Sequence, residues 1–362
     1  MSASIPLIEA RGTHREVGRQ IGEATRDLIA KGLATYQERF LVLAGFGYDE
    51  ALERSHGYLR VAEDYVPQAV DQLRGLAEGA NASFDDLFVF NCSEEFTCAA
   101  DHVWPLGATG SVPAAPEHCT SVAFVAGGRV VSGHNEDWYP EDIEGLVVRK
   151  VTLADGTSYL SVGAAYDLPM TGITSRGLTS AANTVYYRDE RVGVPNNCLL
   201  TVVLQQPDLE HVRDLIAGAP RARGSNHLLC DARGRIWDLE TTGERWAFID
   251  GGDRFAHANN YVDPELAAED ATGSEGSALR RARADEMLVA GIEAGDDPVA
   301  LAEAVLSDHA NEPLSICGHW DDDDPDEDQS VTTASMVWEP AEGRVHIARG
   351  QPCSSEYVTY AL

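Results

Sequence analysis

Residues 119–138, CTSVAFVAGGRVVSGHNEDW, carry the pattern that decides the fold. Two runs rich in β-branched residues flank the pair Gly127-Gly128, which is typical of a β-hairpin with a tight turn. Later segments repeat this pattern at residues 149–162 (RKVTLADGTSYLSV), 227–240 (HLLCDARGRIWDLE) and 333–350 (TASMVWEPAEGRVHIARG). Helical patterns interrupt them at about 208–217 and 276–307. The sequence therefore predicts an α+β fold in which two stacked antiparallel sheets are covered by helices.

The residues before this hairpin have a helical pattern. The capping box Thr13-His-Arg-Glu16 starts one apolar stripe, and similar periodicity runs through residues 48–80. Ser83-Phe-Asp-Asp86 predicts a further helix towards Asn91. Residues 101–118 contain three prolines and no periodicity, which indicates an exposed connector. We therefore expect a helical segment over residues 1–118 and a strand-rich segment over residues 119–362.

The composition excludes several classes of partner. The chain has 362 residues, enough for a well-buried core, with 27 basic and 59 acidic residues and a net charge of −32. Such a charge repels nucleic-acid phosphates and anionic lipids, so neither nucleic acid nor a membrane is an expected partner. Only Lys31 and Lys150 are lysines, and acidic residues are spread along the chain, which suggests adaptation to high salt, with an ordinary acidic protein as the alternative.

The cysteines and histidines predict neither disulfides nor a metal site. The seven cysteines are odd in number and include no C-x-x-C pair, and the opening residues lack the apolar region of a signal peptide. We expect reduced thiols, of which Cys92 and Cys98 are structural, in a cytoplasmic protein. The eleven histidines are dispersed, and the acidic run 321–328 lacks the glycine and final glutamate of a calcium loop. No phosphate-binding or dinucleotide fingerprint is present, so no cofactor is expected.

Cys119 stands where the connector meets the first predicted strand, and HNEDW ends the same hairpin. A two-residue turn at Gly127-Gly128 places Cys119 opposite Glu136, whereas a three-residue loop places it opposite Asp137. The sequence leaves both registers open. In either register a thiol and a carboxylate lie within one strand pair, which makes Cys119 a candidate nucleophile.

The segment EHCTSVAF…GRVVSGHNEDWYP resembles the isopenicillin N acyltransferase family, also called acyl-coenzyme A:6-aminopenicillanic acid acyltransferase-like proteins. These are cysteine N-terminal nucleophile hydrolases, for which the resemblance implies an αββα sandwich and a helical prosegment. Further segments resemble the family in order along the chain: residues 11–23 (RGTHREVGRQIGE), 73–96, 172–185 (GITSRGLTSAANTV), 192–200 (VGVPNNCLL), 256–261 (AHANNY), 311–317 (NEPLSIC) and 350–357 (GQPCSSEY).

The resemblance implies roles for individual residues. The chain would cleave itself between His118 and Cys119, so that residues 1–118 and 119–362 become two subunits. Cys119 would be the nucleophile, and Asp137 would orient the new amino terminus. Asn259 would contribute its amide to the oxyanion hole, and Asn183 would lie near the same site.

Two departures from the family pattern affect this assignment. The residue before the nucleophile is usually small but is His118 here, which bears on the rate of self-cleavage. The family commonly has an arginine after SIC, where this chain has Gly318.

Asn135, Trp138 and Tyr139 lie close to the proposed site along the hairpin and are the candidate substrate-binding residues. Packing at the strand end is the alternative for the two aromatic residues.

The chemistry of an amino-terminal cysteine supports this interpretation. A thiol has a pKa of about 8.5 and an α-amine about 7.7 to 8.0, so one residue supplies both nucleophile and base near neutral pH. We therefore predict a self-processing amidohydrolase or acyltransferase that acts on a small acyl amide or thioester. One alternative is an uncut protein of the same fold that binds a small molecule. Another is a thiol hydrolase that pairs Cys119 with His134 or His257.

Overall fold

The computed structural model describes residues 4–44, 46–98, 119–187, 189–268, 274–319 and 330–362. The predicted connector 101–118, with His118, and the acidic run 321–328 lie outside the described residues. Among the described residues, no helix has the length and apolar character needed to cross a bilayer.

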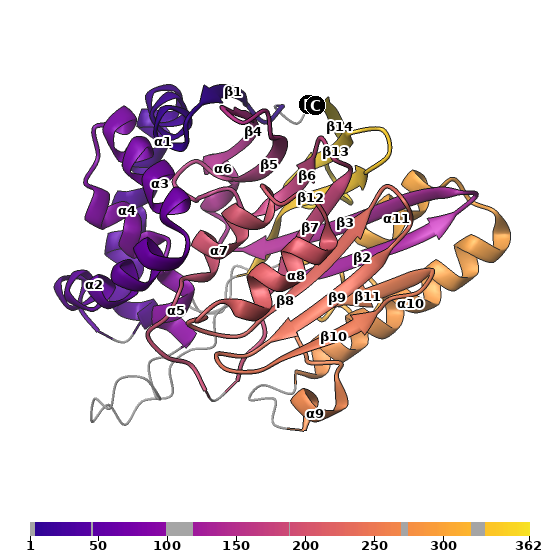
Figure 1. Ribbon diagram of the computed structural model, residues 1–362. Coiled ribbons are helices and arrows are strands. Elements are labelled where there is room, and N and C mark those ends of the chain that lie inside the picture. The colour runs from indigo at the N-terminus through magenta and orange to yellow at the C-terminus, as the bar shows by residue number, and fades with distance from the viewer. Residues whose placement is uncertain (1–3, 45, 99–118, 188, 269–273, 320–329) are drawn as a thin grey trace.

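Two sheets form the centre of the molecule (Figure 1). The eight-stranded sheet has the order β1 (Leu7–Gly12), β4 (Leu146–Leu153), β5 (Ser158–Ala164), β6 (Thr171–Thr174), β7 (Leu178–Asn183), β8 (Ser225–Asp231), β9 (Ile236–Thr241) and β10 (Trp246–Asp250). The six-stranded sheet has the order β11 (Arg254–His257), β2 (Thr120–Ala126), β3 (Arg129–Trp138), β12 (Val331–Glu339), β13 (Arg344–Arg349) and β14 (Val358–Ala361). The four hairpins predicted from the sequence are β2–β3, β4–β5, β8–β9 and β12–β13, and all four are confirmed.

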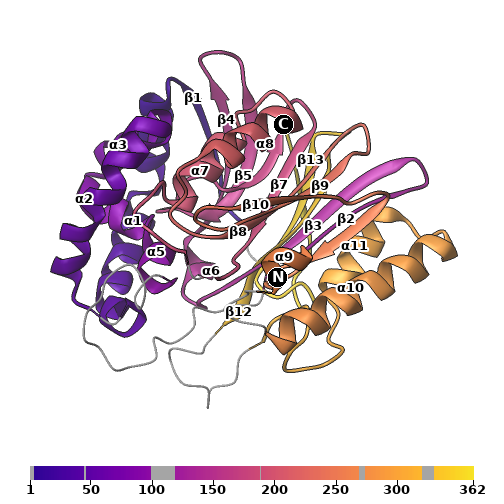
Figure 2. The same ribbon diagram turned by 60° about the horizontal axis from the view of Figure 1, so that its bottom comes forward.

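Helices cover the outer face of each sheet (Figures 1 and 2). One side carries α1 (His14–Ala44), α2 (Tyr48–Tyr65), α3 (Pro67–Ala80), α4 (Phe84–Phe90), α5 (Ser93–Cys98), α7 (Asn196–Val203) and α8 (Leu209–Gly218). The other carries α10 (Glu275–Ala294) and α11 (Pro298–Leu306), and two short helices, α6 (Asp142–Gly145) and α9 (Pro264–Ala267), lie in connections. Between the sheets, buried apolar residues from both, such as Val148, Leu160, Trp338 and Ile347, form one core cluster. The predicted αββα arrangement is confirmed.

The amino-terminal segment is part of the sandwich. Its helices share one buried core with the outer face of the eight-stranded sheet, and β1 adds to the edge of that sheet in parallel with β4. The sequence analysis expected only helices in this segment, so β1 is a correction. It was missed because a six-residue edge strand gives little periodicity.

Local sequence signals explain most helix ends. The capping box is confirmed, since Thr13 N donates to Glu16 Oε2 (2.8 Å) and Glu16 N to Thr13 Oγ1 (3.3 Å). The helical pattern expected over residues 276–307 is two helices, because Gly295 adopts a left-handed φ of 75° that ends α10. Asp297 then caps the start of α11. The helices α1 and α3 cross so closely that a Cβ on Gly18 would lie 1.9 Å from the carbonyl oxygen of Gln72.

Candidate active site

The β2–β3 hairpin fixes the position of Cys119. The ladder runs from Ala126 opposite Arg129 to Thr120 opposite Asn135, so the turn has two residues. Both turn glycines have positive φ, 57° and 77°, as a tight hairpin turn of this type requires. One further step of this register places Cys119 opposite Glu136, which selects the first of the two registers left open by the sequence.

The Cys119 thiol is buried beside two acidic residues. The residue is 5% exposed, and its Sγ lies 3.9 Å from Glu136 Oε1 and 3.8 Å from the backbone oxygen of Asp137. Burial raises the pKa of this thiol well above its ordinary value, and the negative charges of Glu136 and Asp137 raise it further. In the continuous chain the thiol is therefore protonated at neutral pH, and it needs a nearby base to become a nucleophile.

Asn259 comes from the side of β2 opposite β3. The β11–β2 ladder pairs His257 with Ser121, and Asn259 follows β11 by two residues. Thr184, whose backbone oxygen binds the Asn259 side chain, lines the same cavity as Cys119. The Asn259 side chain is fully buried and held at both ends: its Nδ2 donates to Thr184 O (2.9 Å), and its Oδ1 accepts from Arg280 Nη2 (2.8 Å). An amide nitrogen carries two hydrogens, and among the described residues only one acceptor, Thr184 O, binds this nitrogen. The second hydrogen is therefore available to a ligand.

Asn183 presents a second amide to the same site. It ends β7, is fully buried, and its Oδ1 accepts a hydrogen bond from Ser121 Oγ (2.7 Å). Its Nδ2 is buried without a hydrogen-bond partner among the described residues. Asn183 and Cys119 line the same cavity of about 20 Å³, which has room for about one water molecule. A buried amide donor without an acceptor among the described residues, beside a thiol, is suited to stabilising an oxyanion.

Asp137 has the environment of a buried carboxyl group. Neither of its carboxylate oxygens has a hydrogen-bond partner among the described residues. Burial raises the pKa of Asp137 to about 7, against the opposing effects of the nearby Thr332 hydroxyl and, more weakly, of the Arg280 cation. The side chain lies against Gly318, where an added Cβ would be 2.9 Å from Asp137 Oδ2. A residue larger than glycine at this position would press on the carboxylate.

Arg280 is a residue that the sequence analysis missed. It comes from α10, is 1% exposed, and its charge lowers the pKa of both Cys119 and Asp137. The chain thus has a basic group near Cys119 and Asp137 on a helix, although Gly318 stands where the family commonly has an arginine. The sequence gives no signal for it, because Arg280 belongs to a stretch of arginines, RRARAD, in which no member stands out.

The three predicted substrate-binding residues differ in their contacts. Asn135 is fully buried, and its Nδ2 donates to Leu306 O (2.9 Å) and Ile316 O (3.0 Å), so both amide hydrogens bind the backbone instead of a substrate. The rings of Trp138 and Tyr139 meet edge to face at 5.4 Å. Both line a cavity of about 320 Å³ whose other aromatic walls are Tyr36, Phe90 and Tyr166.

The two histidines named as alternative bases have partners of their own. His134 Nδ1 lies 2.8 Å from Ser121 Oγ, and its Nε2 lies 3.2 Å from Glu136 Oε2. The two nitrogens of His257 lie 2.5 Å from Ala258 O and 2.7 Å from Glu240 Oε1. His134 therefore contacts Glu136, the carboxylate beside the thiol, whereas His257 is held within its own buried cluster.

The expectation that the histidines are dispersed is wrong at one place. The Nε2 atoms of His309 and His319 lie 3.0 Å apart, and two cysteines join them. His309 lies 10 residues before His319 and Cys353 lies 34 residues after it, so the fold brings Cys353 to the other three residues.

Two sheets between helical layers, with a buried cysteine directly before a hairpin strand, form the arrangement that the resemblance to cysteine N-terminal nucleophile hydrolases led us to expect. The family model of acyl-coenzyme A:6-aminopenicillanic acid acyl-transferase matches residues 125–354, and the chain belongs to this family. The match includes Asp137, Asn183 and Asn259 and begins just after Cys119. The chain is therefore an enzyme of the amide hydrolase and acyltransferase type, as the sequence predicted.

The comparison with solved structures gives further matches of low sequence identity. Penicillin V acylase from Agrobacterium tumefaciens is 15% identical, with 64% of this chain and 83% of that chain covered and a TM-score of 0.45. A mutant form of conjugated bile acid hydrolase from Clostridium perfringens is 14% identical, with 67% of this chain and 97% of that chain covered and a TM-score of 0.44.

Proposed function

We propose that the chain cleaves itself between His118 and Cys119 and then transfers acyl groups through the Cys119 sulfur. The observation that carries this proposal is the position of Cys119, directly before the central strand β2, with its Sγ 3.9 Å from Glu136 Oε1 and 3.8 Å from the backbone oxygen of Asp137. An amine created at this residue would be the base that the buried thiol otherwise lacks.

The cleavage step requires only water. The Cys119 sulfur attacks the carbonyl carbon of His118, the peptide C–N bond breaks, and the thiol proton passes to the departing nitrogen. Water then hydrolyses the resulting thioester, which leaves the His118 carboxylate and a free Cys119 with both thiol and α-amine. Asp137 would hold the new ammonium group, because its carboxylate is buried nearby without a hydrogen-bond partner among the described residues.

The catalytic cycle reuses the same groups. The free amine accepts the thiol proton, the sulfur attacks the substrate carbonyl, and the amine returns the proton to the leaving group. The amide nitrogens of Asn183 and Asn259 would stabilise the oxyanion, where one donor is typically worth roughly 10² to 10³ in rate. Water or an amine then takes the acyl group from sulfur. No cofactor or metal takes part in these steps.

We further propose that residues 1–118 and 119–362 remain together as two subunits after cleavage. The shared core supports this, because the amino-terminal helices bury their apolar faces on the eight-stranded sheet. Strand β1 adds backbone hydrogen bonds to β4, which belongs to the second segment.

The substrate class is proposed from the cavities. Trp138 lines both the small cavity at Cys119 and the larger aromatic cavity of about 320 Å³. The larger cavity suits an apolar acyl group, with the amide or thioester carbon directed towards Cys119. Glu94 of α5 lines the small cavity and is paired with Arg223, so the amino-terminal segment limits the space at the thiol.

The test is acyl-enzyme trapping by mass spectrometry. Full-length protein is mixed with p-nitroanilides and thioesters of short, long and aromatic acyl groups, and the fragments are weighed after rapid acid quenching. The proposal expects an acyl adduct on a fragment that begins with Cys119, and faster turnover for bulky apolar acyl groups. An adduct on an uncut chain would favour the thiol hydrolase that uses His134. Binding without turnover or adduct would favour the small-molecule binding protein.

A further inference from the structure

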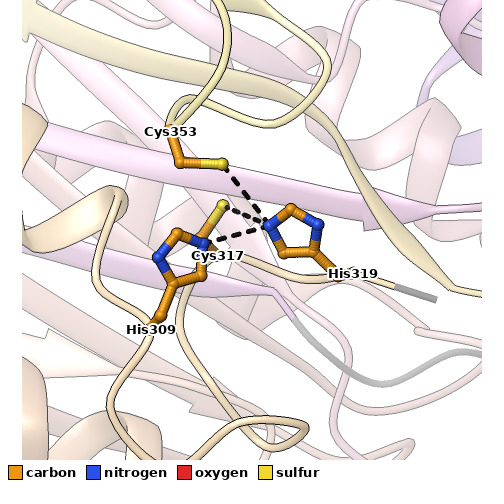
Figure 3. A group of neighbouring side chains, drawn as sticks. All are labelled: His309, Cys317, His319 and Cys353. Carbon is orange, nitrogen blue, oxygen red and sulfur yellow. Dashed lines mark hydrogen bonds between the residues drawn. The ribbon is translucent and has the colours of Figure 1, made fainter. Parts of the chain in front are cut away.

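Four side chains with metal-binding atoms meet at the surface beside the active-site hairpin (Figure 3). They are His309, Cys317, His319 and Cys353, and one ligand atom from each lies within 4.8 Å of the others. His319 Nε2 is the common point, at 3.0 Å from His309 Nε2, 3.5 Å from Cys317 Sγ and 3.4 Å from Cys353 Sγ. In Figure 3 the four side chains converge on one another, with Cys353 on a segment separate from the one that carries His309, Cys317 and His319.

These distances match the edges of a metal-centred tetrahedron. Zinc binds sulfur at about 2.3 Å and imidazole nitrogen at about 2.0 to 2.1 Å, so tetrahedral edges are about 3.6 Å between N and S and about 3.3 Å between two nitrogens. Hydrogen bonding alone explains the cluster poorly, because one imidazole nitrogen cannot bond to three partners at once. We infer that His309, Cys317, His319 and Cys353 form a structural zinc site.

The backbone holds these ligands in place independently of any ion. Cys317 N donates to Asp308 O (3.1 Å), which closes the loop that carries His309. Asn135 Nδ2 donates to Leu306 O and Ile316 O, so the same loop is fastened to β3. The segment that carries Cys353 is fixed by a hydrogen bond from Gly350 N to Thr333 O (2.8 Å). A site built on positioned loops binds a metal without a large ordering cost.

The ligand set indicates zinc and a structural role. Two thiolates and two imidazoles suit zinc and are poor ligands for magnesium or calcium, which prefer oxygen. Four protein ligands complete a tetrahedral shell, so no position is left for a substrate or an activated water. Two thiolates also neutralise the charge of the ion, so the site does not depend on the acidic surface of the protein.

The site would fix the loop that borders the catalytic carboxylate. Gly318 lies between two of the ligands, Cys317 and His319, and its Cα faces the Asp137 carboxylate closely enough that a Cβ would lie 2.9 Å from Oδ2. Gly318 N also donates to Thr332 Oγ1 (2.8 Å), and Thr332 pairs with Asp137 across β12 and β3. The metal would thereby join the segment around Cys353 to the wall of the active site.

The experiment measures metal in the full chain, purified with a reductant and without a histidine tag. After dialysis, elemental analysis is expected to find about one zinc per chain. Protein loaded with cobalt(II) in place of zinc is expected to show thiolate-to-cobalt charge transfer and the intense visible bands of tetrahedral cobalt. Cys353→Ser and His319→Gln, which alter exposed ligands, are expected to lose the retained zinc and these bands.

Matched controls remove the same side chains elsewhere. Cys198→Ala and His211→Ala lie outside the cluster and are expected to keep the zinc and the cobalt spectrum of the wild type. The inference is overturned if reduced wild type retains no zinc and gives an octahedral cobalt spectrum. It is equally overturned if both ligand variants retain zinc as the controls do, or if the reduced preparation contains a Cys317–Cys353 disulfide.

Discussion

Replacement of Arg280 by alanine tests whether this residue positions Asn259, the proposed oxyanion donor. The guanidinium Nη2 donates to Asn259 Oδ1 at 2.8 Å, and both residues are almost fully buried. Arg280→Ala removes this donor and leaves the Asn259 oxygen without that partner. The amide is then free to rotate away from the site. The Arg280 charge also lowers the pKa of Asp137, so its loss shifts ionisation of that carboxyl group further above pH 7.

The size of the effect follows from these two contacts. A buried polar atom that loses its partner typically costs about 1 to 3 kcal/mol of unfolding free energy. If the Asn259 amide no longer reaches the oxyanion, the rate falls by roughly 10² to 10³. The two effects are separable, because the first appears in denaturant unfolding and the second in kcat at temperatures where the variant is folded.

The assay compares the pH dependence of self-cleavage in wild type, Arg280→Ala and the control Arg281→Ala. Arg281 is adjacent and donates to the backbone oxygen of Ala256 (3.2 Å), away from Asn259 and Asp137. We expect the low-pH limb of the rate profile to move to higher pH in Arg280→Ala and to stay in place in Arg281→Ala. In Arg280→Lys, which keeps a positive charge, the limb should lie between those of the wild type and Arg280→Ala. An unchanged profile and rate in folded Arg280→Ala would refute the positioning role.

Three further predictions concern the core, the buried histidine and the substrate cavity. Gly18→Ala places a Cβ 1.9 Å from Gln72 O, so urea unfolding should show a loss of about 1 to 3 kcal/mol, and full stability would contradict the close helix crossing. Burial lowers the pKa of His257, but nearby carboxylates, which include Glu240, raise it, and the net pKa lies above the usual value. The stabilisation that protonated His257 gives the folded protein is therefore complete below about pH 6.5 and is lost as the pH rises through the raised pKa. Glu240→Gln should therefore destabilise the protein more at pH 6 than at pH 9, and an equal loss at both would contradict this. Trp138→Ala should raise KM for aromatic acyl substrates more than for acetyl substrates, whereas equal changes would exclude the cavity as the acyl site.

The hairpins were predictable because their turn residues act locally. The Gly127-Gly128 pair predicted the β2–β3 turn but left two registers for Cys119, and the pairing of Ala126 with Arg129 selects one of them. Capping residues likewise defined helix starts at Thr13 and Ser83. Such signals lie within a few residues of the feature that they determine.

The missed features depend on contacts between distant parts of the chain. Arg280 reaches Asn259 only because α10 packs on the strand that carries the site. His309 and Cys353 are brought together by the order of strands in the six-stranded sheet, and no spacing in the sequence indicates it. The hairpin spacing made Cys119 a candidate nucleophile, and the resemblance to a family proposed its role and that of Asp137.

Intact mass spectrometry of the full-length gene product tests the central claim most directly. Wild-type protein is predicted to give two fragments, one ending at His118 and one beginning at Cys119, and Cys119→Ala is predicted to give one uncut chain. A single full-length mass for the wild type, or the same two fragments from Cys119→Ala, would contradict autocatalytic formation of an amino-terminal nucleophile.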